Sequence, residues 1–364
     1  MLERRSLMSL LIGLTFCVSI WQLMLQQQQK EQFYGNTSHL TVVITLTNND
    51  STIPTFQSAT LSSPLNTSLD LRQQLELLPK NDFNQLIDLE NFEFLTKQKM
   101  CKNLVQSPTV AIVVHSAPLN FRKRLIIRET WGSDDPRAVL VFMIGVVNST
   151  IVQDEIDNEQ RMYGDIVQGN FIDAYRNITY KHVMTLKWFV YFCHEANFLL
   201  KTDDDVFVNT PLMYRYLETP SAYHKQFHNE HQLLLCHRVS GAKVKRTYRS
   251  KWRVSYDEYL NRHFPNYCPG YAILYSSDVV FDLYRQAQKL PYFWIDDIHI
   301  TGNVASKLNI SITPTNGLFL TKTQQEGLLN GRIQTESYPF FVAQPDLSEK
   351  EIRKLWSLVT NVIE

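Results

Sequence analysis

The segment FLLKTDDDVFVN, residues 198–209, joins an apolar run to three consecutive carboxylates and then to a second apolar run. A short apolar run bounded by charged residues predicts a buried strand that ends near the first aspartate. In open α/β sheets, ligands bind beyond the carboxyl ends of the strands, which is where these carboxylates would lie. In an extended backbone, Asp203 and Asp205 would point to one side and Asp204 to the other. The segment therefore predicts a sheet with a site at its edge.

Neighbouring carboxylates repel one another, so crowding three of them is costly unless a cation joins them. Mn²⁺ and Mg²⁺ prefer hard oxygen ligands and typically take one or two carboxylates together with substrate phosphates. We therefore expect a Mn²⁺ or Mg²⁺ ion that holds a nucleotide diphosphate. Asp205 is the first choice of ligand and Asp203 is the second. The alternative interpretation is a solvated acidic turn without a ligand.

A second acidic pair, Asp296 and Asp297, stands between apolar residues in the segment WIDDIHITG, residues 294–302. One interpretation is structural: an N-cap and an acid in the first turn of a helix, both favoured by the helix dipole. The functional interpretation is a general base. We expect His299, in the same segment, to lie on a helix surface and not to bind a ligand.

Around these two segments, apolar runs of strand length alternate with segments of helix length. The expected strands are residues 110–114, 139–147, 197–201 and 272–275. The expected helices are residues 119–131, 155–163 and 175–193, one from Ser277, and one after Ser348, where SEKE fits a capping box. This alternation predicts an α/β domain with a mainly parallel central sheet that is covered on both faces.

The composition excludes several classes of protein. Lys and Arg number 36, as do Asp and Glu, so the chain lacks the basic excess of a general polyanion binder, and we expect no nucleic-acid partner. Only 12 of the 364 residues are glycine, and no two of them form the G-x-G of a dinucleotide-binding fingerprint. The sequence also lacks P-loop, G-x-S-x-G, H-E-x-x-H and C-x-x-C motifs. A metal-mediated diphosphate site is the simpler remaining way to hold a nucleotide.

The amino terminus predicts a membrane anchor. Residues 7–25 form an uncharged stretch about long enough to cross a bilayer core, and Arg4 and Arg5 precede it. We expect a cytosolic tail over residues 1–6, a transmembrane signal-anchor over 7–25, a polar lumenal stem over 26–100, and a folded domain over 101–364. A cleaved signal peptide and a buried core helix are the alternatives for residues 7–25.

Two further features favour a lumenal, oxidising environment. Sequons of the form N-x-[ST], candidate glycosylation sites, occur at Asn36, Asn49, Asn66, Asn148, Asn177 and Asn309. Outside the apolar span, an even number of cysteines allows two disulfides in three connectivities, with buried free thiols as the alternative: Cys101, Cys193, Cys236 and Cys268.

A basic run covers residues 243–253, where Tyr248 and Trp252 are interleaved with six Lys and Arg residues. A solvated loop is the simplest interpretation. A loop near an anionic donor and a face toward anionic lipid are the alternatives, whereas a lumenal location would exclude nucleic acid.

Several motifs occur in a fixed order between Val110 and Leu308. They are FRKRLIIRETWG (121–132), VFMIG (141–145), YGDIV (163–167) with FIDAYRNITYK (171–181), KTDDDVFVN (201–209) and DDI (296–298). In this order and spacing they resemble the β-1,3-galactosyltransferase family of type II Golgi glycosyltransferases, which includes β-1,3-N-acetylglucosaminyltransferases and is related to the fringe proteins. Any one of these motifs alone would be a weak signal.

The resemblance implies a GT-A-type glycosyltransferase domain, preceded by a transmembrane helix and a stem, in a Golgi membrane protein whose catalytic domain is lumenal. It implies a UDP-sugar donor and an inverting transfer to the 3-hydroxyl of a sugar on a glycolipid or glycoprotein. Asp297 is our first choice of general base and Asp296 is the reserve. The candidate donor-binding residues are Asp204, together with Arg124, Arg128 and Lys181, which would face the nucleotide or hold the domain together.

One segment departs from the family pattern. The family usually shows Y-C-x-G-x-G-Y near its acceptor site, whereas residues 267–273 read YCPGYAI, with Ala272 and Ile273 in place of the second glycine and the tyrosine. Galactose is the expected donor sugar, although the same motifs serve N-acetylglucosamine and N-acetylgalactosamine transfer. A catalytically degenerate, lumenal glycan-binding protein is the hypothesis from a different class.

Overall fold

The computed structural model describes residues 71–96, 101, 104, 106–218, 232–315 and 317–361. These residues belong to one compact unit, Thr67–Glu364. No helix within the described residues is both long and apolar enough to span a membrane. The segment expected to form the anchor, residues 7–25, lies outside the described residues, as do the sequons at Asn36, Asn49 and Asn66.

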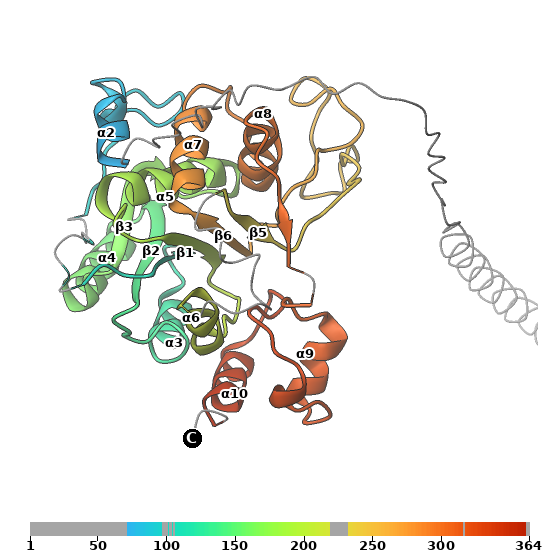
Figure 1. Ribbon diagram of the computed structural model, residues 1–364. Coiled ribbons are helices and arrows are strands. Elements are labelled where there is room, and N and C mark those ends of the chain that lie inside the picture. Colours follow the sequence, from blue (N-terminus) through green and yellow to red (C-terminus); the bar gives the residue numbers. More distant parts are fainter. Residues whose placement is uncertain are drawn as a thin grey trace, which may run out of the picture. The chain divides into compact units, whose positions relative to one another are not determined.

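The described strands form one seven-stranded sheet in the order β3-β2-β1-β4-β6-β5-β7 (Figure 1). The strands are β1 (Val110–His115), β2 (Ala138–Val146), β3 (Ile166–Ile172), β4 (Phe198–Asp203), β5 (Leu234–Cys236), β6 (Ala272–Ser276) and β7 (Thr313–Pro314). Four neighbouring strands, β3, β2, β1 and β4, are parallel, whereas β6 is antiparallel to both β4 and β5. The mixed α/β fold with a mostly parallel sheet agrees with the sequence analysis.

Alternate residues of β1 enter two different hydrophobic cores, because successive side chains of a strand point to opposite faces. Ala111 and Val113 join one core, and Ile112 and Val114 join the other. Every residue of β1 is buried, as is typical of a parallel strand that is covered on both faces. The continuous apolar run from Val110 thus forms a central strand.

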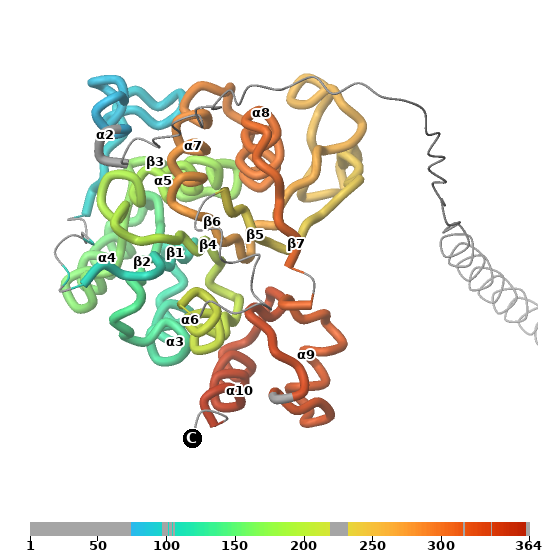
Figure 2. The backbone as a smooth tube through the Cα atoms, viewed as in Figure 1, coloured from blue at the N-terminus to red at the C-terminus, as the bar shows by residue number. Residues whose placement is uncertain are grey.

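Helices cover both faces of the sheet (Figures 1 and 2). On the first face lie α5 (Ile178–Phe192) and α7 (Ser277–Ala287), and on the other lie α3 (Phe121–Arg128), α6 (Thr210–Glu218), α9 (Lys322–Leu329) and α10 (Glu349–Thr360). The remaining helices include α2 (Leu71–Glu76), α4 (Thr150–Tyr163), the short η3 (Tyr175–Asn177), a π-helix η5 (Ile298–Val304) and α8 (Ala305–Lys307). The expected capping box begins α10, where Ser348 and Glu351 bond reciprocally.

The expected strands and helices are confirmed with small shifts of their ends. The sequence analysis did not identify β3, β5 or β7. Two of these are only two and three residues long, too short for a periodic signal. In β3, Gln168, Gly169 and Asn170 interrupt the apolar pattern.

The folded unit begins before Cys101, the residue at which the sequence analysis placed its start. Leu86 and Phe92 are fully buried in the core that contains α5. The buried Lys187 ammonium of α5 donates to the backbone carbonyls of Asp82 and Gln85, and burial lowers its pKa to about 8. The apolar side chains of segment 82–92 enter the core one at a time, so the segment shows no helical or strand period in the sequence. Its polar composition therefore made it resemble a stem.

Both cysteine pairs form disulfides in the structure. Cys101 joins Cys193 at the end of α5, and Cys236 at the end of β5 joins Cys268. The sequence alone left three connectivities open, because pairing depends on which strands and helices become neighbours in the fold.

Candidate active site

The carboxylates of residues 203–205 lie where β4 ends. Asp203 is the last residue of β4, and its partner across the parallel ladder is His115, the last residue of β1. The fully buried Lys201, two residues earlier, donates from Nζ to Asp203 Oδ1 at 2.9 Å and to the carbonyl of Gly270. The acidic turn is therefore fixed to the sheet by a buried ion pair.

Asp204 points away from Asp203 and has three partners. Its carboxylate accepts hydrogen bonds from Ser116 Oγ and Asn120 Nδ2, both at 2.7 Å, and from Lys123 Nζ at 3.0 Å. These donors belong to the loop after β1 and to the first turn of α3. Asp204 holds this loop against β4, so its lone pairs are largely occupied by the protein itself.

Asp203 and Asp205 have fewer partners. Their side chains are 36% and 26% exposed, and Asp205 receives no hydrogen bond from any described residue. Its nearest described cation is Lys123 Nζ, at 3.9 Å. Desolvation raises the pKa of both carboxyl groups; Lys201 opposes the shift at Asp203, and repulsion from Asp203 adds to it at Asp205. A cation would relieve this repulsion.

The oxygen atoms of Asp203 and Asp205 are of the kind that a hard divalent ion prefers, although the described residues of the site do not bring three protein ligands together. Within the described ranges, no three His, Cys, Asp or Glu side chains are arranged to hold a metal. Mg²⁺ and Mn²⁺ sites built on one or two carboxylates complete their coordination with phosphate oxygens and water. Asp203 and Asp205 can supply those two carboxylates.

The second acidic pair approaches the same edge from another direction. Asp296 is buried, and its Oδ2 lies 2.9 Å from His182 Nδ1, on α5. The other ring nitrogen of His182 lies 3.0 Å from the hydroxyl of Tyr275. Burial acts to raise the pKa of Asp296, but the His182 hydrogen bond and the charge of Lys201 outweigh it and lower the pKa. Asp296 is held ionised and is already bonded.

Asp297 is the opposite case. Its Oδ1 is buried and has no hydrogen-bond partner in the part of the chain that the structure describes. Burial, and then repulsion from Asp296, raise the pKa of Asp297 well above its usual range. Asp297 precedes η5 without a capping bond from its side chain, so the N-cap interpretation does not account for it. A buried carboxylate with a raised pKa and an unoccupied oxygen is equipped to accept a proton.

Gly270 leaves the space in which the two clusters meet. A Cβ at this position would stand 2.4 Å from Asp297 Oδ1 and 2.8 Å from Lys201 Nζ. Lys201 thus lies between Asp203 and Asp297, and their charges together raise its pKa although burial acts to lower it. One buried ammonium therefore serves both acidic clusters.

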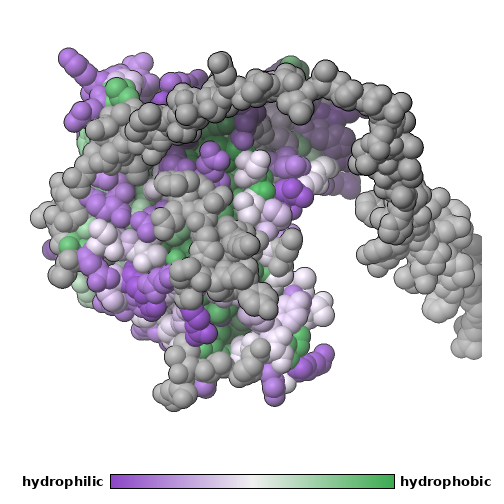
Figure 3. Space-filling view, viewed as in Figure 1, coloured by the Kyte–Doolittle hydropathy of each residue, from purple (hydrophilic) through white to green (hydrophobic). Residues whose placement is uncertain are grey.

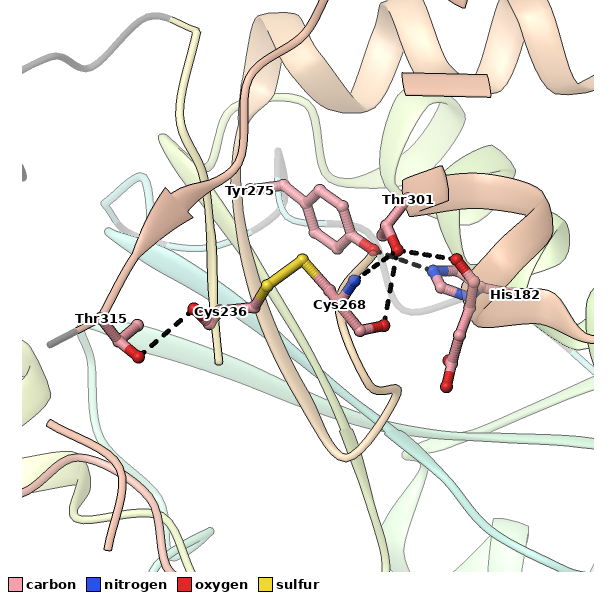
Figure 4. Close-up of a disulfide and its surroundings, with 7 residues drawn as sticks. His182, Cys236, Cys268, Tyr275, Thr301 and Thr315 are labelled. Atoms are coloured by element: carbon pink, nitrogen blue, oxygen red, sulfur yellow. Dashed lines mark hydrogen bonds between the residues drawn. A yellow bond between two sulfur atoms is a disulfide. The ribbon is translucent and has the colours of Figure 1, made fainter. Parts of the chain in front are cut away.

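The Cys236–Cys268 disulfide is tied to the same place (Figure 4). The backbone N–H of Cys268 donates to Thr301 Oγ1 at 2.9 Å, and Thr301 Oγ1 donates to the carbonyl of Asp297 at 2.7 Å. Figure 4 also shows His182 beside Tyr275. The backbone on both sides of the Gly270 space is thereby fixed.

The cations expected near the donor have internal partners. Arg124 is fully buried and bonds to Glu159, Ser116 Oγ and two loop carbonyls. Lys181 donates to the Ser116 carbonyl and pairs with Asp173 at 2.8 Å. Both contact the loop that Asp204 also holds, so they fit the structural alternative and position that loop.

Arg128 does not join the acidic clusters. It pairs with Glu159 at 2.8 Å and with both oxygens of Asp165. It also lines a cavity of about 360 Å³ together with Ile112 and Ala138, from the amino-terminal halves of β1 and β2. The acidic clusters lie at the carboxyl end of β4, so the contacts of Arg128 are those of a structural residue.

Three sequons lie among the described residues. Asn148 and Asn309 are exposed, whereas Asn177 Nδ2 donates to the carbonyl of Ile172. The expectation that His299 lies on a helix surface is wrong: its side chain is 1% exposed, and burial lowers its pKa to about 4. The segment is a π-helix in which nearly every residue is buried, His299 among them.

Sequence reasoning assigned no role to Lys201, His182 or Gly270. A lysine inside an otherwise apolar strand was the available signal for Lys201, because a fully buried lysine needs a partner. His182 gave no comparable signal, since its partner Asp296 is 114 residues away. Gly270 was noted only as part of a motif.

Comparison with known proteins supplies independent information. The family model described as galactosyltransferase matches residues 122–316, more than half of the chain. The chain is 30% identical over 209 residues to β-1,3-galactosyltransferase 5 of Gorilla gorilla gorilla, covering 56% of this chain and 67% of that protein. It is 28% identical over 231 residues to β-1,3-galactosyltransferase 1 of Mus musculus, covering 62% and 68%. Among solved structures, a galactosyltransferase in complex with donor and acceptor sugar analogues has 12% identity and a TM-score of 0.33, covering 69% of this chain and 95% of that one.

Proposed function

Because the chain belongs to the galactosyltransferase family and is a hexosyltransferase, we propose that it moves galactose from UDP-galactose to the 3-hydroxyl of an acceptor sugar, with inversion. The acceptor sugar would be carried by a glycolipid or a glycoprotein. The observation that carries this proposal is the presence, at one sheet edge, of a buried Asp297 Oδ1 without a partner among the described residues and of a partly exposed Asp203–Asp205 turn. We propose further that the domain is of the GT-A type.

Inverting transfer needs one displacement at the anomeric carbon. Asp297 would take the proton from the acceptor 3-hydroxyl as that oxygen forms its bond to the anomeric carbon, and the bond to the diphosphate breaks so that UDP departs. Asp296 would act as a positioning residue, because His182 already occupies its Oδ2. Its negative charge adds to the effect of burial in raising the pKa of Asp297, which makes the deprotonated Asp297 carboxylate a stronger base.

Asp205 and Asp203 would hold Mn²⁺ or Mg²⁺. When bound, the metal supplies charge neutralisation for the diphosphate leaving group. Lys201 favours the ionised form of Asp203 through the contact at 2.9 Å and so opposes the rise in pKa that burial causes. Asp204 fixes the loop after β1 that borders the acidic turn. Arg124 and Lys181 would then act on the donor indirectly, by holding that loop.

We also propose the cellular arrangement that the family resemblance suggests. Residues 1–6 would be cytosolic, 7–25 would anchor the chain in the Golgi membrane, and the remainder would be lumenal. The two disulfides support an oxidising compartment. The stem would end before residue 82, since segment 82–92 packs into the core, and the exposed Asn148 and Asn309 are the described sequons best placed to carry glycan.

The test uses the full-length chain in detergent with Mn²⁺, a panel of acceptor glycans, and in turn UDP-galactose, UDP-N-acetylglucosamine and UDP-N-acetylgalactosamine. We expect a β-1,3-linked product with UDP-galactose, lost when a chelator removes the metal. Transfer from UDP-N-acetylglucosamine alone, or from UDP-N-acetylgalactosamine alone, would show that the donor sugar is not galactose. No turnover with any donor would contradict the enzyme proposal and favour a degenerate, glycan-binding protein.

A further inference from the structure

The segment between the two cysteines of the second disulfide forms a loop beside the site. This loop, residues 237–267, is closed at its base by Cys236–Cys268 and by bridges that pair Val239 with Tyr267 and Lys243 with His263. In Figure 2 it is the gold segment beyond β5. Its base lies two residues before Gly270, where the two acidic clusters meet.

The loop packs directly on the segment that carries Asp297. Val244 and Val254 of the loop form a separate hydrophobic cluster with Phe293, Trp294 and Ile298. Arg246 stabilises the loop internally by donating to four of its backbone carbonyls, those of residues 254, 255, 259 and 261. A folded loop on this segment has a fixed place next to the proposed base.

Two exposed aromatic rings lie on the loop and on η3, Trp252 on the first and Tyr175 on the second. Tyr175 is 51% exposed and Trp252 is 48% exposed. Burial raises the pKa of Tyr175, and the Trp252 side chain acts in the opposite direction. The charges of Asp296 and Asp297 also raise the pKa of Tyr175. The Tyr175 ring lies 5.8 Å from that of Trp294. Half-exposed rings beside a polar site offer an apolar surface on which a sugar ring can pack.

The loop is strongly basic. It contains eight Lys and Arg residues and two carboxylates, Asp257 and Glu258. Glu258 is occupied by Arg176, at 2.7 Å. Among the described residues no carboxylate pairs with the exposed cations of the loop, which are Arg238, Lys243, Lys245, Arg249, Lys251 and Arg262. In Figure 3, the corner that the loop occupies is purple where grey atoms do not cover it.

We propose that loop 237–267 recognises the acceptor, and that the acceptor is an acidic glycan that carries a sulfate or carboxylate group. This inference rests on the proposed function, since it assigns the second substrate of the same site. The aromatic pair Tyr175 and Trp252 would pack on the sugar next to the reacting hydroxyl. Arg249 and Lys251 would pair with the anionic group farther along the glycan, because exposed cations without a carboxylate partner can form charge-assisted hydrogen bonds with it. The contact of the loop with the Asp297 segment favours a glycan substrate over a membrane lipid.

The first experiment compares two acceptors with the full-length chain in detergent, Mn²⁺ and UDP-galactose. The acceptors are a neutral oligosaccharide with a free 3-hydroxyl and the same oligosaccharide with one sulfate ester at another position. We expect the KM of the sulfated acceptor to be about tenfold lower, equal to roughly 1.4 kcal/mol. The preference should weaken as ionic strength rises.

Two variants separate the loop from general charge effects. Arg249→Gln/Lys251→Gln should reduce the KM ratio of the two acceptors to about one. Lys322→Gln/Arg332→Gln removes two exposed cations at and just beyond α9, on the far face of the sheet, and should retain the full ratio. A failure of this inference can be told apart from a failure of the proposed function. The inference requires a loop-dependent difference in KM between the two acceptors, whereas the proposed function requires only that some acceptor is galactosylated.

A binding measurement keeps the inference testable if neither acceptor turns over. Full-length chain is applied to an immobilised panel of neutral, sulfated and sialylated oligosaccharides, and we expect retention on the acidic members that the Arg249→Gln/Lys251→Gln variant loses. Equal KM values together with binding to neutral members alone would overturn the inference. So would loop-dependent binding to vesicles with anionic lipid without any effect on acceptor preference, since the loop would then face the membrane.

Discussion

Two acidic regions, residues 203–205 and residues 296–297, meet at one sheet edge but differ in how water and protein surround them. In the first, Asp203 and Asp205 remain partly exposed and share a region of mutual repulsion. In the second, Asp297 is desolvated and its Oδ1 has no partner among the described residues. The first environment suits a cation and a diphosphate, whereas the second suits a proton.

Each region also contains one carboxylate that the protein itself occupies. Asp204 accepts three hydrogen bonds from the loop after β1 and from α3, and Asp296 is bonded to His182. Adjacent aspartates in the sequence therefore have different tasks. The comparison teaches that the carboxylates proposed for the chemistry have fewer protein partners than Asp204 and Asp296, which hold the surrounding segments in place.

The largest effect is expected for Asp297→Asn, which keeps the shape but removes the proton acceptor. General-base catalysis contributes on the order of 10²- to 10⁴-fold, so turnover should fall by about that factor. The measurement is galactose transfer at saturating donor, with thermal unfolding as the control for folding. Normal turnover in a folded Asp297→Asn protein would show that Asp297 is not the general base and that residues 296–297 do not have the role proposed for them.

Asp205→Ala tests the other region. Loss of a metal ligand removes charge neutralisation worth several kcal/mol at the leaving group, so turnover should fall on the order of 10²-fold. Raising the Mn²⁺ concentration should restore part of the rate, which it cannot do for Asp297→Asn. If the rate does not depend on Mn²⁺ in the unaltered protein or in Asp205→Ala, the metal-binding role proposed for residues 203–205 is contradicted.

The pH dependence of the unaltered protein sharpens the contrast between the two kinds of carboxylate. The pKa of Asp297 is raised by burial and by Asp296, and only the deprotonated form can accept a proton. At saturating Mn²⁺, kcat/KM should therefore fall about tenfold per unit of pH below an apparent pKa that lies well above ~3.9, the value of an ordinary aspartate. A rate that stays level down to about pH 4.5 would exclude Asp297 as the base.

Gly270→Ala perturbs the place where the regions meet. The new Cβ would stand 2.4 Å from Asp297 Oδ1, so the carboxylate must move. A displacement of this size at a catalytic group can cost up to about 10²-fold, and we expect a roughly tenfold loss in kcat. Gly164→Ala, which meets no atom within 4 Å but has a positive φ, controls for loss of a glycine outside the site and the loop. Equal effects of the two substitutions would argue against steric contact with Asp297.

The smallest effect on catalysis is expected for Asp204→Ala. Three hydrogen bonds are lost, one of them to a lysine, so the free energy of unfolding should fall by about 2 to 3 kcal/mol. Thermal or denaturant unfolding measures this, and Asp134→Ala at an exposed position is the matched control. An Asp204→Ala protein with unchanged stability and a catalytic loss like that of Asp205→Ala would place Asp204 among the donor ligands.

Much of the fold could be predicted because its central strands are long apolar runs. The carboxyl end of β4 followed directly from the change from Leu200 to Asp203. The strand β6 was predicted, but its antiparallel direction was not, because the order and direction of strands depend on contacts distant in sequence. The buried segment 82–92 was not predicted either, because its single side chains insert into a core formed by distant residues.

The two acidic clusters were visible in the sequence for the same reason, since charge stood next to buried strands. Their division of tasks was not visible. It depends on Ser116, Asn120 and His182, whose partners lie 84 to 114 residues away along the chain. Only the folded arrangement distinguishes a bonded carboxylate from an unoccupied one.

The most direct test of this division is a calorimetric titration of UDP, with Mn²⁺ present, into the full-length unaltered, Asp297→Asn and Asp205→Ala proteins. We predict that Asp297→Asn binds UDP with the affinity of the unaltered protein although it has lost turnover, and that Asp205→Ala loses most of the Mn²⁺-dependent affinity. Equal loss of UDP affinity in both variants, or retention in both, would contradict the account.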